Sequence, residues 1–228
     1  MPDLLVVAHR GASNAERENT ILAFELAVAL GSDAVELDVR RSADGQMIVH
    51  HDAHLSDGRL IADTSTADLP DHVPGLAAAL DACGKLLVNI EIKNSETEPD
   101  HDPDRRLAAQ VVDLVVQRGQ QDNVLVSSFD LDTVDLVREL NPSIPTALLV
   151  FGGEPGELLE LCARKGHGAI HPHDTQVDAN FMTHARRLDI MVNVWTVDDS
   201  ARMRELVALG VNGIVTNVPD VARTVVDG

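Results

Sequence analysis

Short apolar runs alternate with amphipathic, helix-length segments along almost the whole chain. The runs expected to form strands are residues 4–8, 34–39, 86–92, 124–129, 146–150, 169–171, 191–197 and 213–216. The amphipathic segments expected to form helices are residues 20–30, 105–118, 131–140, 157–165, 179–188 and 200–209. Strands that alternate with helices are typical of a parallel α/β sheet, and eight such units predict a (β/α)8 TIM barrel.

Residues 41–75 interrupt this alternation. The segment contains two Asp-Gly turn signals, Asp44-Gly45 and Asp57-Gly58, with apolar residues beside them, a pattern that favours a hairpin. We therefore expect a short hairpin and loop inserted after the second strand. The acidic segment 94–104 contains proline and is expected to be a solvated loop. With no internal repeat and no linker, residues 1–228 are interpreted as a single domain.

Polar residues are spaced two apart on the second and third expected strands. Glu36 and Asp38 share one face of the run 34–39, and Glu91 and Lys93 share one face of the run 86–92. Active sites of TIM barrels lie at the carboxyl ends of the strands. The three carboxylates should therefore face the same mouth of the barrel.

Three neighbouring carboxylates repel one another, so a positive group must hold them together. One possibility is a network of ion pairs with Arg or Lys, and the other is a bound metal ion. Ligands that are all oxygen suit a hard divalent cation, Mg²⁺ or Ca²⁺. Arg10 and Lys93 could bind an anion. Three carboxylates, one divalent ion and these two cations sum to +1, which one phosphodiester would neutralise.

Composition excludes several classes of function. The formal net charge is −19, which argues against a nucleic-acid partner and against adhesion to anionic membranes. Cys83 and Cys162 show no metal-binding or disulfide spacing. No signal peptide, transmembrane segment or other membrane anchor is visible, so a cytoplasmic location is expected. The chain has one Trp, four Phe and no Tyr, so the core must consist mainly of Ala, Val, Leu and Ile.

Three histidines lie within the sequence IVHHDAHL, at positions 50, 51 and 54. His50 and His51 are expected on a short strand, where adjacent side chains point to opposite sides, so only one of them can face the mouth. His54 is expected in the following loop. His9, at the end of the first strand, is a second candidate for acid–base chemistry, because histidine titrates near neutral pH. The other histidines at 101, 167, 173 and 184 are expected at the surface.

The order of these motifs resembles the glycerophosphodiester phosphodiesterase family. The resemblance extends from about residue 6 to residue 220 and includes AHRGAS, AVELDVRRSADGQMIVHHDAHL, NIEIK and NVWTVDD. It implies a TIM barrel with an insertion after the second strand. It also implies a general acid–base pair at His9 and His51, with His50 as a bystander.

The same resemblance implies the other roles. The metal, usually Ca²⁺ or Mg²⁺, would be held by Glu36, Asp38 and Glu91, and the phosphate would be contacted by Arg10 and Lys93. The substrate would be a glycerophosphodiester, cleaved to glycerol 3-phosphate and an alcohol. Trp195, at the end of a strand, could be a core aromatic or could pack against the glycerol carbons. Glu18-Asn19-Thr20 is interpreted mainly as a helix N-cap.

The chain departs from the family pattern at Arg17, Ser32 and Asn217, which affects the expected loop geometry and substrate fit. The nucleophile is either a hydroxyl of the glycerol or water, and either histidine could be the acid.

Two alternatives use the same residues: a lysophospholipase D-like or sphingomyelinase D-like enzyme, and a catalytically idle binding barrel. The absence of a membrane anchor and of an expected exposed aromatic cluster argues against the lipid-directed enzymes. A metal amidohydrolase would need His-x-His on the first strand, which His9-Arg10-Gly11 does not supply.

Overall fold

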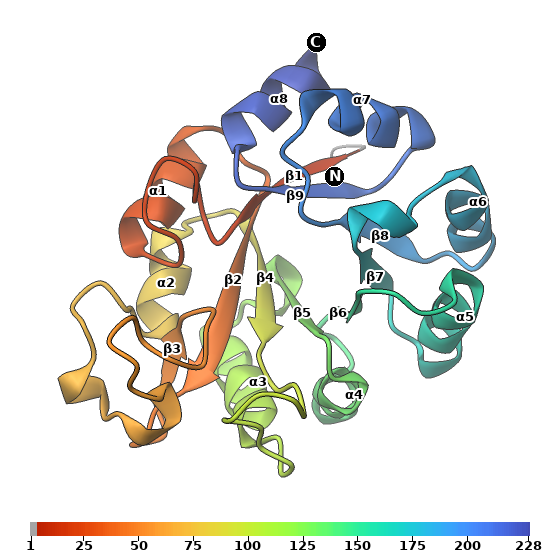
Figure 1. The fold of residues 1–228 in the computed structure, drawn as a ribbon. Coiled ribbons are helices and arrows are strands. Elements are labelled where there is room, and N and C mark those ends of the chain that lie inside the picture. The colour runs from red at the N-terminus through yellow and green to blue at the C-terminus, as the bar shows by residue number, and fades with distance from the viewer. Residues whose placement is uncertain (1–3) are drawn as a thin grey trace.

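The protein is a closed barrel of eight parallel strands surrounded by helices (Figure 1). Its structure, a computed structural model, describes residues 4–228. The barrel strands follow the order β1-β9-β8-β7-β6-β5-β4-β2, and pairing of β1 with β2 closes the ring. These strands are β1 (Leu5–His9), β2 (Ala34–Arg41), β4 (Leu87–Ile92), β5 (Val124–Ser128), β6 (Thr146–Val150), β7 (Ala169–Pro172), β8 (Met191–Val194) and β9 (Gly213–Thr216). The predicted TIM barrel is confirmed.

In the described part of the chain, seven α-helices connect these strands and an eighth follows the last strand. They are α1 (Ile21–Ala29), α2 (Leu76–Ala82), α3 (Arg106–Arg118), α4 (Leu131–Leu140), α5 (Pro155–Lys165), α6 (Ala179–Arg187), α7 (Ser200–Leu209) and α8 (Pro219–Asp227). The sequence prediction did not include α2 and α8, which are only seven and nine residues long. Among residues 4–228, no helix has the length and apolar character needed to cross a bilayer.

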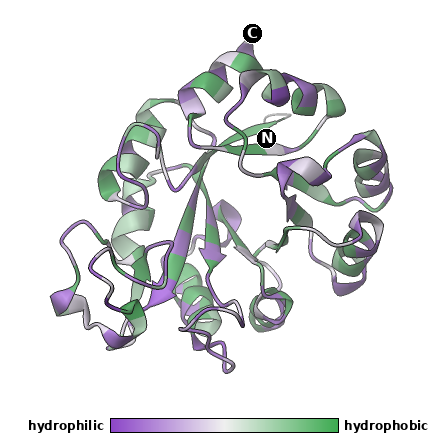
Figure 2. Ribbon diagram, in the orientation of Figure 1, coloured by the Kyte–Doolittle hydropathy of each residue, from purple (hydrophilic) through white to green (hydrophobic). Residues whose placement is uncertain are grey.

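The pairing of β2 with β4 places the polar residues of the two strands side by side. In this parallel register Glu36 lies opposite Asn89, and Asp38 lies opposite Glu91. The alternate residues of the same strands, including Leu37 and Ile90, are fully buried in the apolar layer beneath the helices. Figure 2 shows the hydrophilic stretches of β2 and β4 among otherwise mainly hydrophobic strands. The period of two therefore sends apolar side chains towards the helices and charged ones into the barrel.

The expected insertion after β2 is present. β3 (Met47–Val49) pairs antiparallel with β2, and Gly45 adopts a positive φ of 78° in the connecting turn. The rest of the insertion packs on a small cluster that includes Ile48, Leu55 and Ile61. His50 and His51 were expected on this strand, but both lie just after its end. Their positions are therefore set by the loop and its hydrogen bonds and not by strand alternation.

The acidic segment 94–104 is not simply a solvated loop, contrary to the sequence prediction. The side chain of Arg40 is fully buried, and its guanidinium forms ion pairs of 2.7 Å with both Glu98 and Asp100. The same guanidinium donates through Nε to the carbonyl oxygen of His51, at 2.8 Å. A buried charge needs such partners, so Arg40 ties this segment and the His51 loop to β2.

The prediction that His167 lies at the surface is also wrong. Its side chain is buried and contacts the hydroxyl of Thr146 at 2.8 Å and the carboxylate of Asp135 at 3.0 Å. His167 follows the end of α5, where the chain turns inward to begin β7.

Gly11 is the point at which the chain leaves β1 and passes close to α1. Its φ is +82°, and a Cβ at this position would lie 2.7 Å from both the carbonyl carbon and the Cβ of Ala23. Gly58 has a similar φ of +87°, but no other atom lies within 4 Å of the position of its Cβ. A side chain at Gly11 would therefore add both backbone strain and steric overlap, whereas a side chain at Gly58 would add backbone strain alone.

We predict that Gly11→Ala lowers the free energy of unfolding by about 2–4 kcal/mol, since it adds overlap to an unfavourable φ. Gly58→Ala should lower the free energy of unfolding by about 1 kcal/mol, because it adds only the backbone strain. Denaturant unfolding of the two variants and the wild type provides the measurement. Equal losses for the two variants would contradict the close approach of Gly11 to α1.

Candidate active site

The end of β1 turns sharply so that two consecutive side chains reach the mouth of the barrel. Arg10 has a positive φ of 58°, and Gly11 follows with a positive φ as well. The backbone N–H of Arg10 donates to Oε2 of Glu36 at 3.0 Å. The Arg10 guanidinium lies 3.3 Å from Asp38 Oδ2 and 3.0 Å from the Glu18 carboxylate. A strained backbone of this kind persists only where surrounding contacts hold it.

Glu36, Asp38 and Glu91 form a compact buried cluster. One carboxylate oxygen from each residue can be chosen so that all three lie within 4.8 Å of one another. Lys93 Nζ lies 2.9 Å from Asp38 and 2.5 Å from Glu91. With Arg10 included, three negative charges meet two positive ones, and a charge of −1 remains.

This imbalance shifts the protonation of the three acids. Burial, followed by the charges of Asp38 and Glu91, raises the pKa of Glu36 well above its usual range. Burial also raises the pKa of Glu91, although Lys93 opposes the shift. Burial disfavours the ionised form of Asp38 too, but Lys93 and Arg10 outweigh it and lower the pKa of Asp38. The two cations therefore stabilise the ionised form of Asp38, whereas Glu36 and Glu91 need further positive charge to ionise.

The donors of the cluster fit a hard divalent cation. All three are carboxylates, and Oε1 of Glu36 is buried without a hydrogen-bond partner among the described residues. A buried acceptor without a partner is costly, and a cation with oxygen ligands would satisfy it. Among residues 4–228, no other group of His, Cys, Asp and Glu side chains comes close enough together to hold a metal.

Two histidines face this cluster, and each is oriented through its Nδ1. His9 Nδ1 lies 2.7 Å from the side-chain oxygen of Asn217, and His51 Nδ1 lies 2.7 Å from Oδ1 of Asp52. Because an amide oxygen and a carboxylate only accept, both Nδ1 atoms carry a proton. The Nε2 atom of each ring is therefore free to exchange a proton, and that of His9 lies 4.0 Å from Glu36.

Burial lowers the pKa of both histidines below its ordinary value. For His9 the next cause is the charge of Arg10, while Asn217 opposes the shift. For His51 the charge of Asp38 opposes burial, and Lys93 and Arg10 add to it. A neutral imidazole with a bare Nε2 is the form that accepts a proton.

Asn19 and Asn217 support the site, and sequence analysis gave them no part in it. Thr20 is the N-cap of α1 as expected, but Asn19 also donates to Asp38 Oδ2 at 2.7 Å. Asn217 was noted only as a departure in a loop, yet it accepts the His9 hydrogen bond and itself donates to Asp198 Oδ2 at 2.7 Å. Only the position of Asn217 next to the carboxyl end of a strand could have drawn attention to it.

Aromatic side chains form the opposite wall of the mouth. Trp195 is partly buried and donates its indole N–H to the carbonyl oxygen of His171, at 2.8 Å. Its ring centroid lies 5.5 Å from that of Phe129 and 6.2 Å from that of Phe151. Phe151 is 72% exposed and Phe129 is 42% exposed. The prediction that the chain lacks an exposed aromatic cluster is therefore wrong, because loop residues from three strands converge here.

His171 lies deeper in the barrel than the mouth. Its side chain is buried, Nε2 contacts the amide nitrogen of Asn193 at 2.9 Å, and burial lowers its pKa to about 3. It is therefore a neutral, hydrogen-bonded core histidine.

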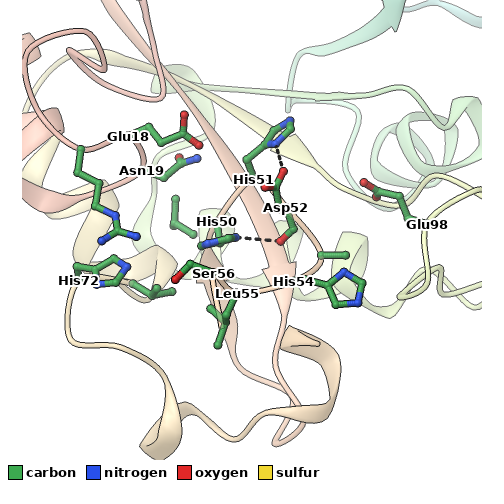
Figure 3. A pocket seen from close by; sticks show the side chains of 14 residues that line it. Glu18, Asn19, His50, His51, Asp52, His54, Leu55, Ser56, His72 and Glu98 are labelled. Carbon is green, nitrogen blue, oxygen red and sulfur yellow. Dashed lines mark hydrogen bonds and ion pairs between the residues drawn. The ribbon is translucent and has the colours of Figure 1, made fainter. Parts of the chain in front are cut away.

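The structure brings together all eight residues singled out from the sequence. A cavity of about 80 Å³ is lined by seven of them, which are His9, Arg10, Glu36, His51, Glu91, Lys93 and Trp195. The eighth, Asp38, contacts two of these residues, Arg10 and Lys93. His51 also lines a second, larger cavity of about 610 Å³. Figure 3 shows His51 and Asp52 at the edge of this larger space, with His50 and His72 further along it.

Comparison with known proteins agrees with this geometry. The sequence profile described as the glycerophosphoryl diester phosphodiesterase family matches residues 9–221. A glycerophosphodiester phosphodiesterase of Bacillus subtilis is 28% identical, and the alignment covers 100% of this chain and 88% of that protein. One from Caldanaerobacter subterraneus is 27% identical, with 95% of each chain covered.

A solved structure shows the same architecture. A phosphodiesterase of Oleispira antarctica, in complex with the product sn-glycerol-3-phosphate, is similar with a TM-score of 0.90 and 25% sequence identity. The comparison covers 98% of this chain and 97% of that one. Since the family profile extends from the end of β1 to the start of α8 and includes all eight candidate site residues, the chain belongs to the glycerophosphoryl diester phosphodiesterase family.

Proposed function

We propose that the protein hydrolyses glycerophosphodiesters to glycerol 3-phosphate and an alcohol, with His9 and His51 as the general acid–base pair. Membership of the family supports the reaction class. One observation supports these roles for His9 and His51. In each ring Nδ1 is bound to an acceptor and Nε2 is left free, and both rings lie beside the buried carboxylate cluster.

In the proposed reaction one histidine removes the proton from the attacking hydroxyl, which belongs to the glycerol or to water. The oxygen forms a bond to phosphorus, and the bond from phosphorus to the alcohol oxygen breaks. The second histidine, protonated on Nε2 as well as on Nδ1, gives its Nε2 proton to the departing oxygen, so that a neutral alcohol leaves. When the attacking hydroxyl belongs to the glycerol, the product is a cyclic phosphate, which water then opens to glycerol 3-phosphate with the two histidines in exchanged roles. Each such proton transfer contributes about 10²–10⁴-fold to the rate.

Arg10 and Lys93 are proposed to hold the phosphoryl oxygens and to stabilise charge that develops on them. Both cations already contact Asp38, which fixes their positions before a substrate binds. Lys93 remains charged, because Glu91 and Asp38 outweigh the effect of burial and raise its pKa.

Glu36, Asp38 and Glu91 are proposed as the ligands of a divalent cation, Mg²⁺ or Ca²⁺. When bound, such an ion would supply Lewis-acid polarisation of a phosphoryl oxygen. The chain's own part is to hold the three carboxylates within reach of one ion and to keep Arg10 and Lys93 beside them.

We predict that His9→Ala and His51→Ala each lower kcat for release of glycerol 3-phosphate by at least about 10²-fold, because a proton transfer is lost. The assay would use glycerophosphocholine, glycerophosphoethanolamine and glycerophosphoglycerol with Mg²⁺ or Ca²⁺. His184→Ala is the control and should retain wild-type turnover, because His184 lies on α6 and lines neither of the two cavities. Wild-type rates in either test variant would contradict the acid–base assignment, and no product from any of the three diesters would contradict the proposed reaction.

A second candidate substrate, a lysophospholipid, is favoured by the exposed aromatic wall. Phe151 and Phe129 offer apolar surface at the mouth, next to the proposed phosphate site. Exposed apolar surface beside a ligand cavity commonly binds the apolar part of the ligand. An acyl chain on the glycerol could lie against these rings.

We therefore predict that Phe151→Ala lowers kcat/KM for lysophosphatidylcholine about fivefold relative to that for glycerophosphocholine, since about 1 kcal/mol of apolar contact is lost. Leu140→Ala removes a similarly exposed apolar side chain at the far end of α4 and should leave this ratio unchanged. Absence of lysophosphatidylcholine cleavage, or an unchanged ratio in Phe151→Ala, would exclude this second substrate.

A further inference from the structure

The larger cavity beside the site has no part in the chemistry proposed above. Its volume of about 610 Å³ is that of a typical ligand pocket. It lies between the loop after β1, residues 49–56 and 72–73 of the insertion, and Glu98 of the segment after β4, and it meets the smaller catalytic cavity at His51 (Figure 3). If His51 is the histidine that protonates the leaving oxygen, the group attached to that oxygen would enter this space.

Three cationic or ionisable side chains from separate segments line one part of this cavity: Arg17, His50 and His72. They are close enough to affect one another, because burial and then the charges of Arg17 and His50 lower the pKa of His72. Asp71, which acts in the opposite direction, is exposed and does not line the cavity. We call Arg17, His50 and His72 the basic corner.

The acids that line the same cavity already have partners: two are in ion pairs with arginines, and Asp52 accepts the hydrogen bond of His51. The pairs are Glu18 with Arg10 at 3.0 Å, Glu98 with Arg40 at 2.7 Å and Asp52 with His51 at 2.7 Å. Arg17 forms no ion pair with any residue of the described chain, 4–228. Arg17 therefore brings an unpaired positive charge to this cavity, in a protein whose net charge is −19.

The hydrogen bond of His50 leaves one of its ring nitrogens for a ligand. His50 Nδ1 donates to the carbonyl oxygen of Asp52 at 2.9 Å. The other nitrogen, Nε2, has no hydrogen bond to any residue in the described part of the chain, so it is left for a contact with a ligand. Figure 3 shows His50 and His72 lying near each other on one side of the cavity.

We propose that the basic corner binds a second anionic group carried by the leaving alcohol, and so selects glycerophosphodiesters whose headgroup is itself negatively charged. This inference rests on the proposed function and names the substrate class of the same site. Arg10 and Lys93 hold the scissile phosphate, while Arg17, His50 and His72 receive a carboxylate or a second phosphodiester.

Two pairs of substrates test the charge preference, because the members of each pair differ by one anionic group. Glycerophosphoserine differs from glycerophosphoethanolamine by a carboxylate. Bis(glycerophospho)glycerol differs from glycerophosphoglycerol by a second phosphodiester. The measured quantity is the ratio of kcat/KM within each pair, corrected for the two equivalent cleavage sites of the bis compound. The two pairs also distinguish a carboxylate from a phosphodiester as the preferred group.

We expect the wild-type ratio to be about tenfold in favour of the more anionic member of at least one pair, and to fall as salt is added. Arg17→Gln should reduce that ratio about fivefold, because one exposed charge is lost, and Arg17→Lys should restore most of it. Arg59→Gln is the control, since Arg59 is an exposed arginine of the insertion that pairs with Asp57 at 2.8 Å. It changes the net charge equally and should leave the ratio at its wild-type value.

Ratios near one for the wild type in both pairs would overturn the proposal while leaving the proposed reaction intact. The same conclusion would follow if Arg17→Gln and Arg59→Gln reduced the ratio equally, because the effect would then be one of net charge only. If no diester released glycerol 3-phosphate, the proposed reaction itself would fail, and the inference would fail with it. Arg17 is exposed in a loop, so the variants should melt at the wild-type temperature, which a thermal scan checks.

Discussion

The structure depends on the crowding of Glu36, Asp38 and Glu91 at one end of β2 and β4, held by only two nearby cations. The parallel register that sets Asp38 opposite Glu91 makes this crowding unavoidable once the barrel closes. Much of the surrounding structure can be understood as compensation for it. The left-handed turn at Arg10, the hydrogen bond from Asn19 and the position of Lys93 all bring positive charge or N–H donors to the carboxylates.

Periodicity allowed much of the fold and the composition of the site to be predicted. Leu37 and Ile90 alternate with Glu36 and Glu91, and that alternation alone indicates which side chains enter the barrel. The helices that escaped prediction are short. The loops were harder, because their geometry depends on tertiary contacts: the buried guanidinium of Arg40 reaches Glu98, 58 residues away. The hydrogen bond between His9 and Asn217 joins residues 208 positions apart, which no local pattern reveals.

In the proposed function, the two cavities would bind different parts of the substrate. The smaller one uses strand ends, whose positions the barrel fixes, and the larger one uses loops and the insertion after β2. Chemistry that must be held within a fraction of an ångström suits rigid strand ends, while specificity suits loops. His51 belongs to both cavities, and Arg40 holds its backbone through the carbonyl oxygen. The loop that contains His51 can therefore take part both in selecting the headgroup and in transferring a proton to it.

The central claim is that the buried carboxylates form a cation site, and calorimetric titration of the metal-free protein with Ca²⁺ and Mg²⁺ tests it most directly. We expect one ion per chain, with binding that weakens from pH 7.5 to pH 5. Because burial and the neighbouring charges raise the pKa of Glu36, a proton competes with the ion as the pH falls. Glu36→Gln should weaken binding at least about tenfold and reduce this pH dependence, whereas Glu25→Gln, at an exposed position on α1, should bind as the wild type does. Absence of binding, or wild-type affinity in Glu36→Gln, would contradict the account.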